Sequence, residues 1–297
     1  MGMLEGKVAI VTGAGRGIGR GEALLLAEQG AAVVVNELDA AAGRDVVDEI
    51  DAAGGSAVVD TGDCSDPAAA GALVQRAIEE FGGLDALVNN AGILRDRTIV
   101  KMTPEEWDAV ITVHLRGHYA PTQAACAYWK ESGRAGRIVC TSSTSGLLGN
   151  FGQANYGAAK AGIAAFAQIV AQEMARYGVT CNAIAPAART RMTEGAYGQI
   201  DAGAGFDFWH PDNVAPMVAF LCSDAAAHIS GKVFGVQGNS VELYQPWTSV
   251  AEVVNEQGRW DPETLARRVD ELFPGFLLPP GATNGMSRLR HSLTQRD

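Results

Sequence analysis

Short apolar runs alternate along this chain with longer segments of helical periodicity. The runs are nearly continuous in apolar residues, which is typical of parallel strands that are covered on both faces. The seven predicted strands span residues 8–12, 32–36, 57–60, 86–89, 137–142, 180–184 and 233–236.

The segments between these runs follow the 3.6-residue period of a helix and span residues 20–29, 40–53, 67–81, 104–130 and 156–177. One of them has a strong start signal, because Thr103 can cap it, Pro104 suits its first position and Glu106 completes a capping box. Strands that alternate with helices through right-handed crossovers predict an α/β fold with a Rossmann-type, doubly wound, seven-stranded parallel sheet.

The pattern changes beyond residue 244, where prolines interrupt it at positions 246, 262, 274, 279 and 280. One clear helix is expected there, over residues 262–273. The last residues have no apolar stripe and are expected to be mobile. The sequence therefore predicts a single domain over 1–244, a C-terminal extension with one helix over 245–280 and a mobile tail over 281–297.

Composition narrows the classes of function. The chain has 297 residues and a net charge of −11, so a surface for nucleic acid or for anionic membranes is not expected. No run approaches the roughly 18 apolar residues of a membrane span, and the N-terminus does not resemble a signal peptide. The histidines form no H-x-x-x-H pair, so no metal site is expected. The cysteines form no C-x-x-C pair and are expected to be free thiols in the cytoplasm: Cys64, Cys126, Cys140, Cys181 and Cys222.

A glycine-rich turn follows the first predicted strand and opens the first predicted helix. Its glycines allow a tight turn and a close approach of the backbone to a pyrophosphate, which the helix N-terminus attracts. An ordinary loop is the alternative, but the position between strand and helix favours a dinucleotide site. The expected cofactor contacts in this turn are Gly13, Arg16, Gly17, Ile18 and Gly19.

The end of the second strand bears on the choice of cofactor. Glu37, preceded by Asn36, stands where a carboxylate would bind the hydroxyl groups of the adenosine ribose. That charge would repel a 2′-phosphate and favours NAD over NADP. Arg16 argues the other way, because a guanidinium in the glycine turn could pair with the phosphate. We expect NAD, with NADP as the alternative.

Two further turns extend the predicted cofactor site. Asp63 and Cys64 follow the third strand and are expected to reach the adenine amino group, although Asp63 could instead belong to a helix cap near Asp66. Small and amide side chains follow the fourth strand, at the sheet edge where ligands bind in open α/β folds. These are Asn90, Ala91 and Gly92.

Tyr156 and Lys160 are four residues apart in a predicted helix and therefore lie on one face of it. A free phenol has a pKa of about 10, but a nearby cation favours the phenolate and makes it a usable base. Ser143, on the neighbouring strand, could hydrogen-bond the oxygen of an alcohol or ketone. Y-x-x-x-K is frequent by chance, so the glycine turn is what supports a catalytic interpretation.

The motifs TG-x-x-x-G-x-G, N-N-A-G, Ser143 and Y-x-x-x-K, in this order, resemble the short-chain dehydrogenase/reductase family over about residues 1–244. The stretches NNAGILRDR, VHLRG and GNFGQANY are similar to the (3R)-hydroxyacyl-CoA dehydrogenase part of peroxisomal multifunctional enzyme type 2, also called 17β-hydroxysteroid dehydrogenase type 4. The resemblance implies that Tyr156 is the general base, that Lys160 lowers the phenol pKa and holds the nicotinamide ribose, and that Ser143 orients the substrate oxygen. It also implies that Pro186 and Thr190 contact the nicotinamide carboxamide.

Two positions depart from the common family pattern. His114 stands where most members carry an asparagine that completes a proton relay, and the similar subfamily also has histidine there. It could relay protons through its imidazole, or it could be a packed helix residue. After the sixth strand the family's P-G is Pro186-Ala187, with one residue fewer before Met192, which makes the role of Thr190 less direct than that of Pro186.

The stretch between Thr190 and His210 is short and rich in glycine and alanine, which suits an open site and a long acyl thioester with its CoA outside. Four arginines could meet CoA phosphates or instead form surface ion pairs: Arg95, Arg97, Arg189 and Arg191. Three aromatic residues could line the acyl or steroid pocket or simply pack the loop: Phe206, Phe208 and Trp209.

The leading interpretation is an NAD-dependent oxidoreductase that converts a (3R)-hydroxyacyl-CoA to the 3-oxoacyl-CoA, or a 17β-hydroxysteroid to its ketone. The alternatives are an NADPH-dependent 3-oxoacyl reductase and a dinucleotide-binding scaffold without catalysis. The complete set of Ser143, Tyr156 and Lys160 argues against the scaffold. Broad apolar faces on the helices over 104–130 and 156–177 predict a homodimer or homotetramer, which the resemblance also implies.

Overall fold

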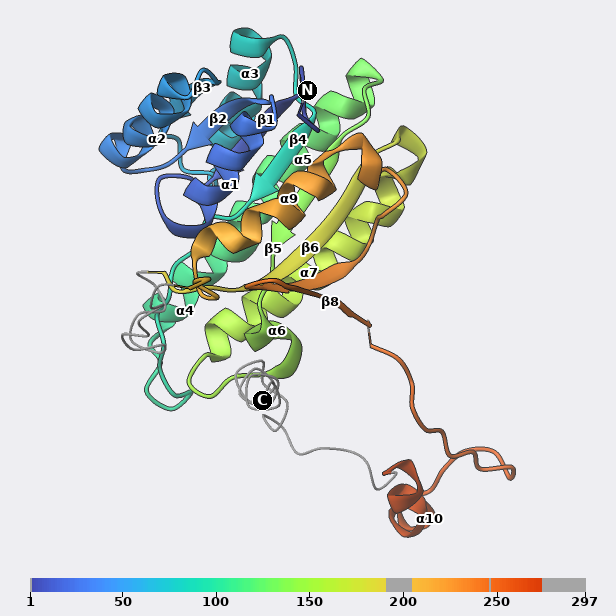
Figure 1. The fold of residues 1–297 in the computed structure, drawn as a ribbon. Helices are drawn as coiled ribbons and strands as arrows, with labels where there is room; N and C mark the ends of the chain where they lie inside the picture. The colour runs from blue at the N-terminus through green and yellow to red at the C-terminus, as the bar shows by residue number, and fades with distance from the viewer. Residues whose placement is uncertain (1, 191–204, 246, 274–297) are drawn as a thin grey trace. The chain divides into compact units, whose positions relative to one another are not determined.

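A computed structural model of the chain describes residues 2–190, 205–245 and 247–273. At its centre is one eight-stranded sheet in the order β3-β2-β1-β4-β5-β6-β7-β8 (Figure 1). The strands are β1 (Val8–Thr12), β2 (Ala32–Asn36), β3 (Ser56–Asp60), β4 (Ala86–Asn89), β5 (Arg137–Thr141), β6 (Thr180–Ala187), β7 (Val233–Gln237) and β8 (Ser240–Tyr244). The first seven run parallel, so the predicted doubly wound fold is confirmed.

The eighth strand is an addition to the predicted sheet. β8 turns back from β7 and pairs with it antiparallel at the edge. Its residues are all partly or fully exposed, so it lacks the continuous apolar run by which the other strands were predicted.

The helices on the sheet are α1 (Gly17–Glu28), α2 (Ala40–Ala52), α3 (Pro67–Phe81), α4 (Pro104–Ile111), α5 (Gly117–Ser132), α6 (Thr144–Leu148), α7 (Ala154–Met174) and α9 (Ala215–Cys222). The single helix predicted over 104–130 is interrupted, because the π-helical turn η1 (Thr112–Arg116) joins α4 to α5. Such turns widen a helix locally and occur often at functional sites.

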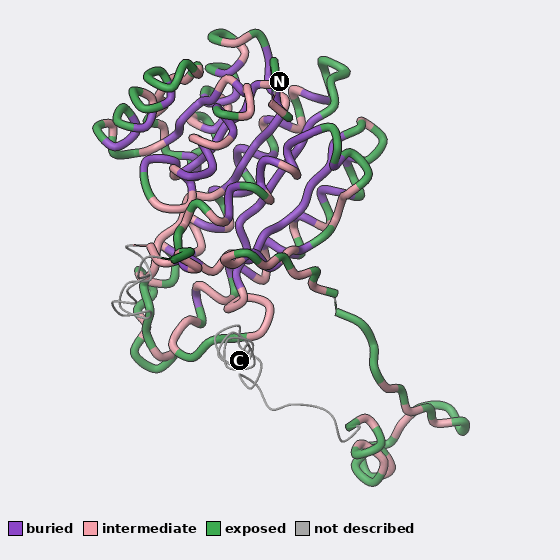
Figure 2. The backbone as a smooth tube through the Cα atoms, viewed as in Figure 1, coloured by how far each residue is buried: buried purple, intermediate pink, exposed green. Residues whose placement is uncertain are grey.

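Two hydrophobic cores lie on the two faces of the sheet. One contains residues of α1, α2 and α9, and the other contains residues of α3, α5 and α7. Within β1, Ala9 and Val11 face the first core while Val8 and Ile10 face the second, which is the two-residue period of a strand. Figure 2 shows the result as purple strands through the middle of the molecule. Burial on both faces explains the continuous apolar runs.

Local hydrogen bonds explain where several helices begin. The hydroxyl of Thr103 accepts from the N–H of Glu106 at 3.2 Å, and the Glu106 carboxylate accepts from the N–H of Thr103 at 3.1 Å, so the predicted capping box of α4 is present. Asp39 and Asp66 cap α2 and α3, and each accepts from two backbone N–H groups.

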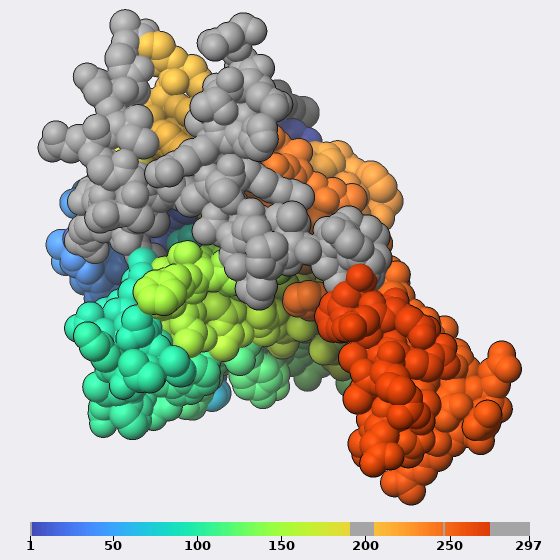
Figure 3. All heavy atoms as spheres, turned by 90° about the horizontal axis from the view of Figure 1, so that it is seen from below, coloured from blue at the N-terminus to red at the C-terminus, as the bar shows by residue number. Residues whose placement is uncertain are grey.

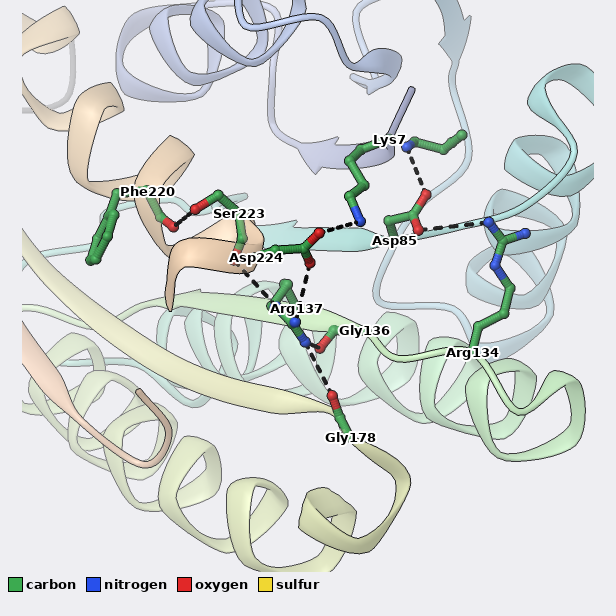
Figure 4. A network of polar contacts seen from close by, with 10 residues as sticks. Lys7, Asp85, Arg134, Gly136, Arg137, Gly178, Phe220, Ser223 and Asp224 are labelled. Carbon is green, nitrogen blue, oxygen red and sulfur yellow. Dashed lines mark hydrogen bonds and ion pairs between the residues drawn. The ribbon is translucent and has the colours of Figure 1, made fainter. Parts of the chain in front are cut away.

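A polar network closes the amino end of the sheet (Figure 4). Arg137, at the start of β5, is buried and donates to the carbonyl groups of Gly136 and Gly178. It also pairs with Asp224 at 3.4 Å, and Lys7 pairs with the same carboxylate at 2.9 Å. The buried guanidinium is therefore satisfied, as a charge removed from water must be.

A boundary between two compact units falls between Tyr244 and Gln245. Beyond it the described residues form the helix α10 (Pro262–Arg268), which Asp261 caps, and the 3₁₀ turn η5 (Val269–Leu272). The tail predicted over 281–297 lies outside the described residues. Of the helices described, none combines the length and apolar character that crossing a membrane would require.

Candidate active site

The candidate site lies at the carboxyl edge of the sheet. The chain winds away in opposite directions from β1 and β4, and this leaves the crevice that binds ligands in open α/β sheets. Two loops meet at this edge: the N–H of Arg97 donates to the carbonyl of Gly152 at 2.8 Å. In Figure 3 the turquoise segment around residue 100 accordingly lies beside the yellow-green segment around residue 150.

The turn between β1 and α1 requires glycine for two reasons. Gly13 and Gly17 have positive φ angles of 63° and 56°, which other residues rarely adopt. A Cβ atom on Gly13 would lie 2.8 Å from Cα of Ala91, and one on Gly19 would lie 2.3 Å from Nδ2 of Asn90. The turn thus packs directly on the N-N-A-G segment. No side chain caps the start of α1, which leaves its first N–H groups for a phosphate.

Thr12, at the end of β1, is a site residue that sequence reasoning missed. Its hydroxyl accepts from the N–H groups of Asn90 and Ala91 at 3.0 and 3.1 Å. Asn90 Nδ2 donates back to the carbonyl groups of Thr12 and Gly13. These bonds hold the two predicted cofactor turns together. The T-G pair at the start of the glycine motif is the feature of the sequence that could have pointed to Thr12.

Ile18, also predicted as a cofactor contact, is half-buried, and its side chain packs against the core.

A carboxylate that follows β2 lies at the glycine turn. Glu37 accepts from the N–H of Gly15 at 3.1 Å and from the N–H of Asp39 at 3.2 Å. The neighbouring Asn36 is buried, and its side-chain amide donates to Asp60 at 2.8 Å. Asn36 therefore ties β2 to β3 through its side chain, while Glu37 remains beside the turn.

Arg16 is paired with a carboxylate. Its guanidinium lies 2.6 Å from Asp39, and the two side chains are 47% and 45% exposed. The hydrogen bond from Arg16 holds the pKa of Asp39 below its ordinary value. Asp39 is also the cap of α2, so its position is determined by the helix. The guanidinium that could have met a 2′-phosphate is thus engaged within the protein.

Asp63 and Cys64 lie in the loop after β3. Asp63 is exposed and accepts from the N–H of Ser65 at 2.8 Å. The cap of α3 is Asp66, and Asp63 closes the turn before it. Cys64 is buried, and burial raises the pKa of its thiol to about 12, so it stays protonated at neutral pH.

Tyr156 and Lys160 share one face of α7, as their spacing predicts. The Nζ atom of Lys160 lies 5.6 Å from the centre of the Tyr156 ring. The lysine is only 2% exposed and donates to the carbonyl of Thr141 at 2.5 Å. Burial lowers the pKa of Lys160 to about 7, so this ammonium titrates near neutral pH. The tyrosine beside it is half-buried.

Ser143 lies just beyond the end of β5, which stops at Thr141, one residue before the predicted end of the strand. It caps α6, where its hydroxyl oxygen accepts from the N–H of Ser145 at 3.2 Å. A serine that accepts in this way keeps its own hydrogen to donate. α6 lies against α7, since a Cβ atom on Gly146 would be 2.4 Å from the N atom of Ala161. This contact brings Ser143 to the helix that carries Tyr156.

His114 lies in η1 and is 1% exposed. Its ring packs edge-on against Tyr156, with ring centres 5.2 Å apart. Its Nε2 atom lies 2.7 Å from the carbonyl oxygen of Ile93. Burial lowers the pKa of His114 to about 3, so the imidazole is neutral.

The Nδ1 atom of His114 is buried and has no hydrogen-bond partner among the described residues. Packing alone does not account for an unpartnered ring nitrogen beside Tyr156.

Asn155 is a second residue that sequence reasoning missed. It is fully buried, and its Nδ2 atom donates to the carbonyl groups of Arg95 and Glu106 at 3.0 and 3.1 Å. Its Oδ1 atom accepts from the N–H of Tyr156 at 2.7 Å. The start of α7 is therefore anchored both to the loop after β4 and to α4. The sequence shows an asparagine beside the tyrosine, but nothing marks it as buried.

The loop beyond β6 approaches the glycine turn. Pro186 lies near the end of β6, and the Cγ2 atom of Thr190 is 3.4 Å from the position that a Cβ atom on Gly17 would take. Trp209 is buried and packs edge-on against Phe208 at 5.0 Å. These two aromatic residues thus pack the described part of the loop.

The arginines suggested as CoA ligands differ in their surroundings. Arg97 and Arg189 form ion pairs with carboxylates. Arg95 is exposed, with its guanidinium on the carbonyl of Leu94. Arg191 lies outside the described residues.

Comparison with known proteins agrees with this geometry. Residues 7–199 match the family model of short chain dehydrogenases. The chain is 47% identical over 287 residues to a hydroxyacyl-CoA dehydrogenase of Mycobacterium tuberculosis, covering 92% of this chain and 90% of that protein. It is 45% identical over 260 residues to peroxisomal multifunctional enzyme type 2 of Drosophila melanogaster, covering 86% of this chain but 41% of that longer protein.

A solved structure leads to the same family. The crystal structure of a short chain dehydrogenase from Mycobacterium avium has a TM-score of 0.85 and 48% identity, and the match covers 94% of this chain and 98% of that one. The glycine turn and the uncapped start of α1 fit the nicotinamide dinucleotide, NAD or NADP, that this family uses. The chain therefore belongs to the short chain dehydrogenase family and is an oxidoreductase.

Proposed function

We propose that this protein oxidises a (3R)-hydroxyacyl-CoA to the 3-oxoacyl-CoA with NAD. The observation that carries the proposal is the buried Lys160, which the Thr141 carbonyl holds with Nζ 5.6 Å from the ring centre of Tyr156. Bound NAD would accept the hydride from the carbinol carbon. Tyr156 would remove the hydroxyl proton, Lys160 would favour the phenolate, and Ser143 would donate to the substrate oxygen.

The choice of substrate class is supported by the relatives. One relative is named a hydroxyacyl-CoA dehydrogenase and another is named peroxisomal multifunctional enzyme type 2. Both are more than 40% identical to this chain. Exposed Arg95, at the loop that meets residue 152, is available for a CoA phosphate. A 17β-hydroxysteroid is the second substrate to test, because the same hydride and proton transfers would oxidise it.

The preference for NAD is supported by the charges beside the glycine turn. Glu37 and Asp39 are two carboxylates beside the glycine turn, and Arg16 is already paired with Asp39. The carboxylate of Glu37 would repel a 2′-phosphate. Asp39 would compete with the phosphate for the guanidinium of Arg16. The remaining predicted cofactor contacts belong to the same proposal. Asp63 and Cys64 would contact the adenine, and Pro186 and Thr190 would contact the nicotinamide. Three residues after β4 would line the cofactor site at the edge of the sheet: Asn90, Ala91 and Gly92.

We further propose that neutral His114 takes part in the proton relay through a water molecule at its unpartnered Nδ1 atom. His114→Asn, which keeps a polar side chain, should retain most turnover, whereas His114→Leu should lose it. Equal turnover in the two variants would count against the relay.

Steady-state rates test the proposal. Turnover of a panel of (3R)-hydroxyacyl-CoAs and hydroxysteroids would be followed through NADH formation, with NAD and NADP compared on the best substrate. Tyr156→Phe should lose turnover by about 1,000-fold while NAD binding is largely kept. Tyr177→Phe, outside the site, is the matched control. Wild-type turnover in Tyr156→Phe would overturn the role of the phenol, and a strong NADP preference would favour the reductase alternative.

We also propose that the chain acts as a homodimer or homotetramer in the cytoplasm. Large apolar side chains are exposed on the helices predicted to pair, among them Tyr119 of α5 at 49% and Ile169 of α7 at 53%. All five cysteines are free thiols, as suits a reducing compartment. Cell fractionation would check the location.

A further inference from the structure

His118 is a buried histidine to which the proposed reaction gives no role. It lies in the first turn of α5, directly after η1, and is 1% exposed. A buried imidazole is expected to have hydrogen-bond partners, because leaving its nitrogens unpaired costs free energy. The partners of this ring connect it to Lys160.

The first partner is the backbone of Thr141, the last residue of β5. The N–H of Thr141 donates to Nε2 of His118 at 3.2 Å. Because a backbone N–H can only donate, Nε2 must carry the lone pair, and the ring proton must be on Nδ1. Burial, and after it the charge of Lys160, lowers the pKa of His118 well below its usual value, which agrees with a neutral ring. The backbone groups of His114 and Asn89 lie within hydrogen-bonding reach of the same ring.

The second step runs from Thr141 to the lysine. β4 ends at Asn89, whose partner in β5 is Cys140. Thr141 is the next residue of β5, so its backbone N–H and C=O groups have no partner strand on the β4 side of the sheet. His118 accepts from its N–H, and Lys160 donates to its carbonyl at 2.5 Å. One residue at the end of β5 thus has its N–H on the imidazole and its C=O on the ammonium.

We propose that His118 is a positioning residue that orients the Thr141 carbonyl and thereby holds the ammonium of Lys160 beside Tyr156. The inference rests on the proposed function, because it assigns His118 to the lysine of that reaction. Without an acceptor at Nε2, the N–H of Thr141 would turn toward water or another acceptor. Thr141 and the carbonyl group that follows its Cα atom would then shift, and the lysine would lose its fixed distance to the phenol.

The pH profile of turnover tests this role with three substitutions. His118→Gln can place its side-chain oxygen where Nε2 lies, so the profile should match that of the wild type. His118→Leu has a similar volume but no acceptor, and His118→Asn carries its acceptor too close to the backbone to reach Thr141. Both should lower kcat about 10-fold, with KM for NAD changed less than about 2-fold, and should move the acidic limb to higher pH. Leu73→Ala, which removes a buried side chain of α3 from the core, is the control for lost stability, and its acidic limb should not move.

Each result is decisive for one proposal. A folded His118→Leu with the kcat and acidic limb of the wild type would overturn the role of His118 while Tyr156→Phe remains inactive. If His118→Leu does not fold, the pair of amide variants decides: a shift in His118→Asn but not in His118→Gln supports the inference, and equal profiles overturn it. High activity of Tyr156→Phe in the same assay would instead overturn the proposed function, and the inference with it.

Discussion

Burial controls the protonation of three nitrogen-bearing side chains around the candidate site. It lowers the pKa of His114 to about 3 and of Lys160 to about 7, and it moves the pKa of His118 in the same direction. Of these three groups, only Lys160 titrates near neutral pH. Two neutral imidazoles beside one ammonium avoid the repulsion that adjacent buried cations would cause. Because burial keeps both imidazoles neutral, two histidines can lie next to this lysine without repelling it.

Glu22 is a buried carboxylate in α1, the helix that follows the glycine turn. It is 0% exposed, its oxygens have no partner among the described residues, and burial raises its pKa to about 8. Between pH 4.5 and about 8 the folded state holds a proton that the unfolded state has released. The contribution of Glu22 to the free energy of unfolding therefore falls as pH rises through this range.

Glu22→Gln should remove that dependence. We expect the free energy of unfolding of the variant to exceed that of the wild type by on the order of 3 kcal/mol at pH 9, and by much less at pH 5. Urea unfolding at the two pH values measures this difference. Glu28→Gln, on the exposed end of the same helix, is the control. A gain of equal size at both pH values would show that Glu22 is not protonated in the folded state.

Asp39→Asn should increase the use of NADP. Asparagine keeps the cap of α2 but releases Arg16 from its ion pair, so the guanidinium can meet a 2′-phosphate. We expect kcat/KM with NADP to rise about 10-fold while kcat/KM with NAD changes little. Asp66→Asn is a matched control, because it caps α3 in the same way without an arginine. An unchanged NADP value would mean that Arg16 does not reach the phosphate.

At the scale of elements, the contact of α6 with α7 assembles the catalytic residues. Gly146 of α6 lies so close to α7 that a Cβ atom would be 2.6 Å from the backbone carbon of Lys160. Ser142 adds a hydrogen bond across the same junction, since its hydroxyl donates to the Lys160 carbonyl at 2.7 Å. The serine that caps α6 and the lysine of α7 are thus placed by one helix crossing.

Gly146→Ala should separate the two helices. The added methyl group meets backbone atoms, which cannot move aside as a flexible side chain would, so Ser143 should shift from Tyr156. We expect kcat to fall by about 10-fold or more in the steady-state assay. Gly71→Ala in α3 has open space and should be active and stabilised by about 0.5–1 kcal/mol. Wild-type kcat in Gly146→Ala would show that the crossing tolerates a wider spacing.

At the scale of the whole molecule, sedimentation tests the proposed assembly. Ile169→Glu places a charge on the exposed apolar side of α7 and should reduce the mass from that of an oligomer towards that of the 31.0 kDa chain. Met3→Glu, an equally exposed apolar position near the N-terminus, should leave the mass unchanged. A wild-type protein that sediments as a monomer would contradict the assembly.

Much of the sheet could be predicted because each strand is covered on both faces. The predicted bounds of β1, β2 and β4 match the structure at both ends. β8 was missed because it is a partly exposed strand at the edge of the sheet and has no apolar run. The π-helical turn was missed because one widened turn barely disturbs helical periodicity, although it is the turn that carries His114.

The strand–helix alternation, the glycine turn and the shared helix face of Tyr156 and Lys160 could all be predicted, because these features depend on residues close together in the chain. The folded chain was needed to show that Thr12 joins Asn90, 78 residues away, and that His118 reaches Lys160 through Thr141. Such hydrogen bonds depend on which strand ends become neighbours in the sheet, and a polar residue type alone does not specify its partner.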